Sequence, residues 1–346
     1  MTVVNSLSLC ARVTLDLHSL NNEGTEGNQQ QTRMVHIIDQ HGQRAVVNAV
    51  SGDMFKHILV EHLVPLLQDA RQPLSPGAAV YDADRINTSQ AFVDFCEKEQ
   101  EFEVNGKKEK RKAYESEVLT KILTDCSLTD MAGTLVTRGR AVGRKSVVEF
   151  GWVVGLPQDG AGQPVTVTEQ YFHVKYAPEG RGAAAGGETV AGKQAIFHRP
   201  ASSGIYALIC NLDLYRIGLN DITRQYTVNQ DDRQARAKAL VHALAATLLK
   251  PTGAQRNTQN PHIVACEGVV AYSATSLPSP TVSPLNDNYR DQIAQAATVL
   301  NTIKADSVTV KPFATLADGV KALAALAADL QVPGARTNGT QEEAGR

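Results

Sequence analysis

Ser6-Leu-Ser-Leu-Cys-Ala-Arg-Val-Thr-Leu-Asp-Leu17 alternates between apolar and polar side chains over most of its length. Successive side chains of an extended chain point to opposite sides, so one face of this segment would carry only apolar groups. These groups are Leu7, Leu9, Ala11, Val13, Leu15 and Leu17. The pattern predicts a half-buried β-strand that packs one face against a hydrophobic core.

Extended and helical segments follow one another along the rest of the chain. Period-two or β-branched segments predict further strands at residues 34–38, 134–136, 146–156, 166–176, 193–199, 205–214, 263–272 and 308–311. Apolar residues at helical spacing predict helices at residues 51–70, 114–124, 231–251, 286–303 and 316–330, and Asp231 or Asp232 is expected to cap the third of them. This order resembles a split β-α-β, ferredoxin-like sheet with insertions, which is an α+β fold.

Several segments interrupt this pattern. Residues 71–115 are polar and irregular, and we expect them to project from the core. Residues 177–192 are rich in Gly and Ala between extended segments, which predicts a long β-hairpin with a flexible tip. The glycine- and glutamine-rich residues 21–33 are expected to form a polar loop. The tail from Pro333 has the composition of a disordered end.

The composition excludes several classes of protein. Of the 346 residues, 42% are apolar, enough for a sizeable core, but the formal net charge is −2. The basic excess typical of nucleic-acid-binding proteins is therefore missing, and any such contact must use local basic clusters and backbone donors. Five scattered cysteines offer no zinc-finger spacing and suggest a reducing compartment, and no apolar stretch is long enough for a bilayer. We expect a cytoplasmic protein with no metal, no cofactor and no membrane partner.

Four segments, taken in order, carry a resemblance to a known family. They are Leu15-Asp-Leu-His-Ser-Leu-Asn-Asn-Glu-Gly-Thr-Glu-Gly-Asn-Gln-Gln-Gln-Thr-Arg33, Ala49-Val-Ser-Gly-Asp-Met-Phe-Lys-His57, Asp125-Cys-Ser-Leu-Thr-Asp-Met-Ala-Gly-Thr-Leu135 and Ser203-Gly-Ile-Tyr-Ala-Leu-Ile-Cys-Asn-Leu-Asp-Leu-Tyr-Arg-Ile-Gly218. The last segment, a strand that ends in an Asp and an Ile-Gly pair, is the most specific. Together they resemble the DevR-type family of CRISPR-associated autoregulators, the guide-RNA-binding backbone subunits of type I Cascade complexes in the RAMP superfamily.

The resemblance implies both an architecture and a function. The implied fold has a modified RRM/ferredoxin-like palm (residues 1–70, 125–163 and 205–330), a fingers-like insertion (71–124), a thumb β-hairpin (164–204) and a disordered tail (333–346). The implied protein is non-catalytic, oligomerises as a helical filament along a guide crRNA and presents that RNA for pairing with a target DNA strand. Its implied partners are the crRNA, the other Cascade subunits and further copies of the chain.

Five groups of residues are candidates for RNA contact. They lie in the 21–33 loop, at the start of the first helix where amides and the helix dipole attract phosphate, in a basic cluster, beside the hairpin tip and after Pro251. The residues are Asn28, Gln31 and Arg33; Ser51, Gly52, Lys56 and His57; Arg138, Arg140, Arg144 and Lys145; Phe172 and Phe197; and Gln255, Arg256 and Asn257. Each group also has a structural explanation, as a polar loop, a helix cap, a solvated connection or an aromatic brace of the hairpin.

Two functions of other classes stay open from the residues alone. A nuclease would need clustered carboxylates, whereas Asp125, Asp130 and Asp213 are separated and in structural-looking contexts. No P-loop, zinc-protease or nucleophile-elbow motif appears. The alternatives are a metabolic α+β enzyme whose site carries no known motif, and a transcriptional autoregulator, for which no helix-turn-helix is visible. The aromatic stacking pair of an ordinary RRM is also missing from the central strands, so RNA should not lie across the sheet.

Overall fold

A mixed α+β fold is built on one eleven-stranded, mainly antiparallel sheet. The computed structural model describes residues 2–104, 106–159, 161–175, 195–254 and 257–334. The main path of the sheet runs β16 (Val308–Phe313), β15 (His262–Ser273), β2 (Ser6–His18), β14 (Ala195–Leu212), β12 (Val153–Gly155), β6 (Arg44–Val50) and β5 (Met34–Ile38). Beside this path lie β11 (Val148–Phe150), β13 (Thr166–Lys175), β4 (Gln29–Thr32) and β3 (Asn22–Glu26).

The opening strand β2 lies in the middle of the sheet, between β14 and β15. Its alternation is confirmed up to Leu15, since Leu7, Leu9, Ala11, Val13 and Leu15 are all buried. The prediction is wrong for Leu17, which is 46% exposed. Leu17 has a φ of 54°, and the register against β14 shifts between Ser202 and Gly204, so the strict alternation ends before this residue.

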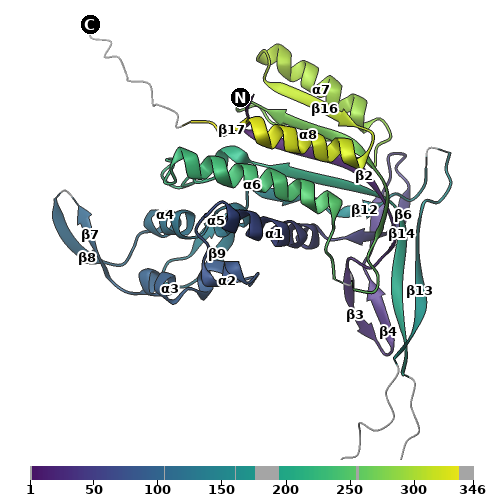
Figure 1. The fold of residues 1–346 in the computed structure, drawn as a ribbon, viewed down its shortest axis with the longest axis horizontal. Helices are drawn as coiled ribbons and strands as arrows, with labels where there is room; N and C mark the ends of the chain where they lie inside the picture. Colours follow the sequence, from purple (N-terminus) through teal and green to yellow (C-terminus); the bar gives the residue numbers. More distant parts are fainter. Residues whose placement is uncertain (1, 105, 160, 176–194, 255–256, 335–346) are drawn as a thin grey trace, which may run out of the picture.

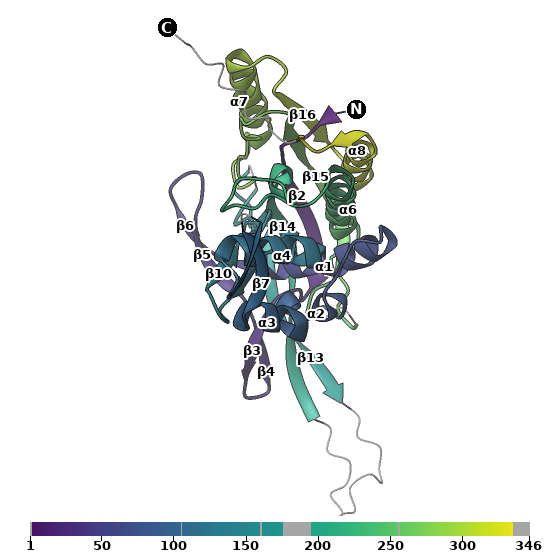
Figure 2. The same cartoon turned by 90° about the vertical axis from the view of Figure 1, so that its left-hand side faces the viewer.

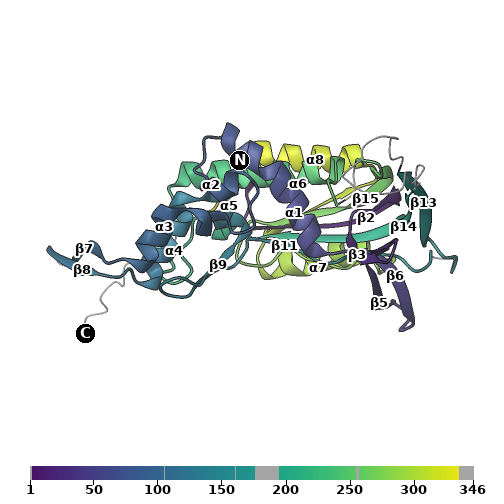
Figure 3. The same ribbon diagram turned by 90° about the horizontal axis from the view of Figure 1, so that it is seen from below.

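Helices cover the two faces of the sheet unequally (Figure 3). On one face lie α1 (Gly52–Asp69), α6 (Gln230–Leu249) and α8 (Leu316–Asp329), which pack on the odd-numbered side chains of β2 and form the main core. On the other face α7 (Tyr289–Ile303) covers Cys10, Val269 and Ala271 in a second, smaller core. None of the helices in the described ranges is long and apolar enough to cross a membrane.

Local sequence explains where the two longest helices begin. Ser51 caps α1, since its hydroxyl accepts a hydrogen bond from the Met54 amide at 3.2 Å. The apolar stripe expected on this helix is buried at Phe55, Ile58, Leu59 and Leu63 and half-buried at His62 and Leu66. For α6 the predicted cap is wrong. Asn229, not Asp231 or Asp232, accepts the bond from the Asp232 amide at 2.8 Å, because the helix starts one residue before the two acids and places them in its positive first turn.

The segment after α1 was expected to be irregular, and this expectation is wrong. Residues 71–115 contain α2 (Pro76–Ala79), the 3-10 turn η1 (Arg85–Thr88), α3 (Gln90–Glu97) and the hairpin of β7 (Gln100–Val104) and β8 (Lys107–Arg111). The helix predicted at 114–124 is confirmed as α4 (Glu115–Asp125), and the strand predicted at 134–136 as β9 (Thr134–Val136). Between them lies α5 (Ser127–Ala132), and β9 pairs with β10 (Val142–Arg144). Helices this short contain too few apolar residues to show a helical periodicity in the sequence. The insertion does project, with β7–β8 at the end of the molecule remote from β13 (Figure 1).

The two ends of the described chain are tied to each other. Strand β1 (Thr2–Val3) pairs in parallel with β17 (Leu330–Gln331), and a second 3-10 turn, η2 (Leu214–Arg216), follows β14. The disordered tail was expected to begin at Pro333, but the carbonyl of Pro333 accepts a hydrogen bond from Arg233 at 2.9 Å. The chain is therefore held up to that residue, and residues 335–346 lie outside the described ranges.

A buried ion network joins α5 to β10, to α6 and to the turn after β14. The carboxylate of Asp130, fully buried on α5, accepts hydrogen bonds from Arg144 at 2.7 Å and from Arg236 at 2.9 Å. It also accepts the backbone amide of Gly218 at 2.9 Å. Arg144 bonds further to Asp221 at 2.8 Å. The structural context expected for Asp130 is confirmed, because one carboxylate fixes three separate segments.

Candidate nucleic-acid interface

The long hairpin of β13 and β14 meets a shorter one at its base (Figure 2). Residues 21–33 were expected to be a loop, but they form the hairpin β3–β4. The carbonyl of Asn28 accepts the His198 amide of β14 at 2.9 Å, and the carbonyl of Gln30 accepts the side-chain amide of Gln170 of β13 at 2.8 Å. The predicted RNA contacts Asn28 and Gln31 therefore lie on an extended arm that is fixed against the base of the long hairpin.

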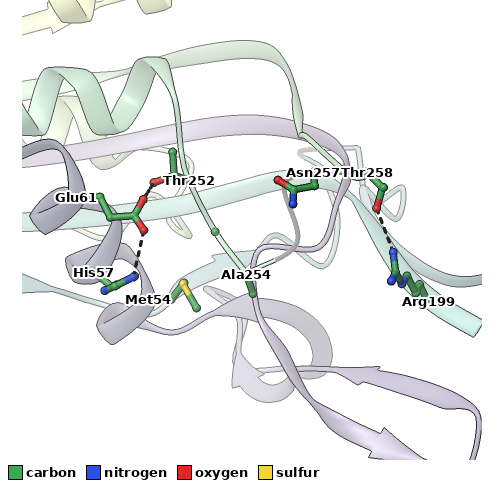
Figure 4. Close-up of a pocket in the computed structure, with 9 residues that line it drawn as sticks. Met54, His57, Glu61, Arg199, Thr252, Ala254, Asn257 and Thr258 are labelled. Carbon is green, nitrogen blue, oxygen red and sulfur yellow. Dashed lines mark hydrogen bonds and ion pairs between the residues drawn. The ribbon is translucent and has the colours of Figure 1, made fainter. Parts of the chain in front are cut away.

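A groove opens between this base and the first helix (Figure 4). Its volume is about 610 Å³. Helix α1, strand β14 and the loop after α6 supply its lining, which is Met54, His57, Glu61, Arg199, Thr252, Gly253, Ala254, Asn257 and Thr258. Of the sequence candidates it brings together only His57 and Asn257. Gln255 and Arg256, predicted beside Asn257, lie outside the described residues.

The groove combines one guanidinium with short polar groups. Arg199 donates to the Thr258 hydroxyl at 3.1 Å and lies over the Phe197 ring at 4.8 Å. Across the groove, His57 Nε2 is 3.3 Å from Glu61 Oε1, while Glu61 Oε2 accepts the Thr252 hydroxyl at 2.5 Å. In the described part of the chain no group of three or more His, Cys, Asp or Glu side chains could hold a metal ion. The groove can bind an anionic, hydrogen-bonding ligand through Arg199 and its neighbours.

The four candidates at the start of α1 do not form one site. The Ser51 hydroxyl is used by the cap, and a Cβ on Gly52 would lie 2.6 Å from the Phe150 carbonyl oxygen, so Gly52 is explained by backbone packing. His57 lines the groove, whereas Lys56 does not. Burial, and then the nearby Arg85 charge, lower the pKa of Lys56. Lys56 and His57 are neighbours in the sequence, but successive side chains of a helix do not share a face, so only His57 points into the groove.

Arg33 lies against Trp152, a residue that was not among the candidates. Its guanidinium carbon is 5.1 Å from the centre of the Trp152 ring. Trp152 is the only tryptophan of the chain and is 47% exposed. A single tryptophan can be noticed in the sequence, but its position just before a short strand does not predict that its side chain is exposed.

The predicted basic cluster is split, and one member is corrected. Arg144 is buried and its side chain is bound within the ion network of Asp130, so it cannot meet a phosphate at the surface. The alternation of β10 points it inward, since Val142 and Arg144 are buried and Gly143 is exposed. The other three candidates are exposed. Arg140 lies 5.3 Å from the Tyr114 ring centre, and Lys145 pairs with Glu149 at 2.9 Å.

The two candidate phenylalanines lie on opposite faces of the long hairpin. Phe172 pairs across the strands with His198 at a ring distance of 4.5 Å and is 74% exposed. Phe197 pairs with His173 at 5.6 Å and is partly buried. Cross-strand partners share a face and neighbours along a strand do not, so these two rings cannot hold the same base from both sides.

Comparison with known proteins identifies the family. The model of the family described as "CRISPR-associated negative auto-regulator DevR/Csa2" matches residues 9–294. The chain belongs to this DevR/Csa2 family. The resemblance read from the four sequence segments is therefore confirmed. No curated protein sequence matches this family member.

Two solved structures resemble this DevR/Csa2 protein at low identity. One is titled "CRISPR RNA-guided surveillance complex, pre-nicking" and the other "CRISPR RNA-guided surveillance complex". Each is 10% identical and aligns with 94% of this chain and 99% of its own, with TM-scores of 0.45 and 0.46 respectively.

A buried histidine lies behind the base of the long hairpin of this family member. His18, at the end of β2, is 2% exposed, and its ring centre is 4.8 Å from that of Tyr206 on β14. Its Nδ1 accepts the Leu20 amide at 3.4 Å. Burial lowers the pKa of His18 from 6.5 to about 4. The imidazole is therefore neutral in the folded protein at pH 7.

This histidine makes stability depend on pH. In the unfolded chain His18 takes up a proton near pH 6.5, and in the folded chain only near pH 4, so acid favours unfolding between these values. We expect this group to remove about 3 kcal/mol of unfolding free energy between pH 7 and pH 4. Urea titrations of the protein and of His18→Gln at several pH values measure the difference. Equal pH slopes for the two proteins would show that His18 does not titrate in this way.

Proposed function

We propose that this DevR/Csa2 protein is a non-catalytic backbone subunit of a type I CRISPR surveillance complex, and that copies of it line up along a guide crRNA. The observation that carries the proposal is the polar groove at the base of the long hairpin, in which Arg199, His57 and Asn257 meet. Family membership supports the class of complex, and the groove offers a guanidinium and neighbouring polar groups to a ribose–phosphate strand. The further partners proposed are the other Cascade subunits and, through the guide, the target DNA strand.

The proposal gives a role to each part of the chain. In this proposal residues 1–70, 125–163 and 205–330 form an RRM-like palm, the insertion at 71–124 forms fingers and the hairpin at 164–204 a thumb. The long hairpin and the insertion project at opposite ends of the molecule (Figure 1), which suits a subunit that reaches toward neighbours on both sides. A head-to-tail contact of this kind generates a filament when its rotation does not close a ring.

The charge distribution suits contact with the RNA backbone without sequence reading. Arg199 lies beside hydroxyl and amide groups, which bind phosphate and ribose but do not read base edges. A guide must vary in sequence, so specificity is left to base pairing. The net charge of −2 also keeps repulsion between like subunits low. Asn28, Gln31, Arg138, Arg140 and Lys145 stay candidates for further contacts along the strand.

Binding to three nucleic acids distinguishes this proposal from its alternatives. We expect single-stranded RNAs of unrelated sequence to bind with similar affinity, and the affinity to fall steeply as salt rises. Fluorescence anisotropy with two labelled RNAs and one DNA duplex, at low and high ionic strength, measures this. A transcriptional autoregulator would instead prefer one duplex sequence, and a metabolic enzyme would bind none of the three.

A further inference from the structure

The sole tryptophan of the chain is exposed at the junction of the palm strands and the first helix. Val153 of β12 is buried in the main core opposite Val50 of β6. Alternation therefore turns Trp152 to the opposite face of the sheet, away from α1. There 47% of the residue is accessible. The exposed part of the indole offers a flat aromatic surface for stacking.

Arg33 holds a positive charge over this ring. Its guanidinium carbon lies 5.1 Å from the ring centre, within the range of a cation–π contact. The backbone beneath it is fixed, since the Arg33 carbonyl accepts the Ala49 amide at 3.0 Å and the Asn48 side chain at 3.1 Å. The Trp152 ring offers a surface for stacking, and the Arg33 guanidinium places a positive charge beside it. A base on its phosphate-linked ribose has the matching chemistry.

The backbone just before Trp152 packs against the start of α1. A Cβ on Gly52 would lie 3.1 Å from the Gly151 carbonyl oxygen, so the residue before Trp152 touches the first turn of the helix. One turn on, His57 lines the groove with Arg199. The backbone that carries Trp152 and the lining of the groove are both attached to the first two turns of α1.

We propose that Trp152, held by Arg33, is a stacking platform for one base of a bound single-stranded RNA. This inference rests on the proposed function, and it adds a base contact to the contacts with phosphate and ribose. The platform accepts any base, because every base has a π-face, and so it does not conflict with guides of variable sequence. Arg33, packed over the indole, holds the ring in its orientation.

A single tryptophan makes the stacking directly visible. Titration of the protein with oligouridylate should quench its tryptophan emission, because no other residue contributes to that signal. We expect Trp152→Ala to weaken binding of labelled oligouridylate about tenfold, whereas Trp152→Phe, which keeps a ring, should stay close to the parent protein. An abasic ribose–phosphate oligomer should bind the parent protein and Trp152→Ala equally, because it offers no base to stack.

The outcomes separate this inference from the proposed function. RNA that binds the parent protein without a change of emission, and binds Trp152→Ala as tightly, would overturn the platform and leave the RNA-binding function standing. Unchanged RNA binding with a loss of self-association of Trp152→Ala in sedimentation would also overturn it, because the ring would then be a protein contact. A parent protein that ignores every RNA would contradict the proposed function itself.

Discussion

Replacing Asp130 by Asn should lower the free energy of unfolding by about 3 to 5 kcal/mol, because it breaks a buried ion pair on one side only. The Asp130 carboxylate is fully buried and receives Arg144 on one oxygen and Arg236 on the other. An amide in its place offers one acceptor oxygen and turns N–H donors toward a guanidinium. At least one buried cation would lose its anionic partner.

The effect should extend beyond α5, because the network is shared. Arg236 belongs to α6, Arg144 to β10, and the Gly218 amide to the turn after β14. Loss of one carboxylate loosens all three at once. We therefore expect a single cooperative transition at lower urea concentration rather than local fraying of the insertion.

Urea unfolding followed by far-UV circular dichroism measures this, with Asp125→Asn as the matched control. Asp125 pairs with Lys121 at 2.7 Å on an exposed face of α4, so its loss should change stability by at most about 1 kcal/mol. Both variants replace an aspartate by asparagine, and the two positions lie in neighbouring helices, α4 and α5. Equal unfolding midpoints for the two variants would contradict the role assigned to Asp130.

Removing the groove's guanidinium should weaken RNA binding across all sequences. We expect Arg199→Ala to lower the affinity for single-stranded RNA by about five- to tenfold, because one charge-assisted phosphate contact is lost. The slope of log affinity against log salt should fall by about 0.7, the value for one phosphate of a single strand. Arg199→Lys keeps the charge, so it should restore the slope and part of the affinity.

The control for Arg199 is a cation outside the groove. Lys304 follows the last turn of α7, is exposed, and does not line the groove. Lys304→Ala removes the same charge and should leave both affinity and slope unchanged. Anisotropy titrations at several salt concentrations compare the three variants with the parent protein. Equal losses for Arg199→Ala and Lys304→Ala would mean that only net charge matters and that the groove has no special role.

Regular side-chain patterns made much of the fold predictable. Alternation located β2, and helical spacing located α1, α6, α7 and α8 within a few residues. The two segments expected at 193–199 and 205–214 are one continuous strand, β14, because Pro200 does not end it. The hairpin β3–β4 was missed since its Gly- and Gln-rich strands have low strand propensity. They are held by hydrogen bonds to β13 and β14, which local sequence does not reveal.

The candidate site was less predictable, because it depends on side-chain direction. The sequence singled out His57 and Asn257 but not Arg199, whose place on the groove depends on the pairing of β13 with β14. Arg144 was read as a surface cation because its strand is only three residues long and its inward face is set by Asp130. Exposure of Trp152 likewise depends on β12 lying between β14 and β6.

Assembly along RNA of increasing length tests the central claim most directly. Native mass spectrometry of the protein mixed with single-stranded RNAs of unrelated sequence, each at several lengths, counts the copies on every strand. If copies line up on the ribose–phosphate chain, the number bound should rise in regular steps with RNA length and be the same for each sequence. A fixed number of copies at every length, or no bound RNA at low salt, would contradict the account.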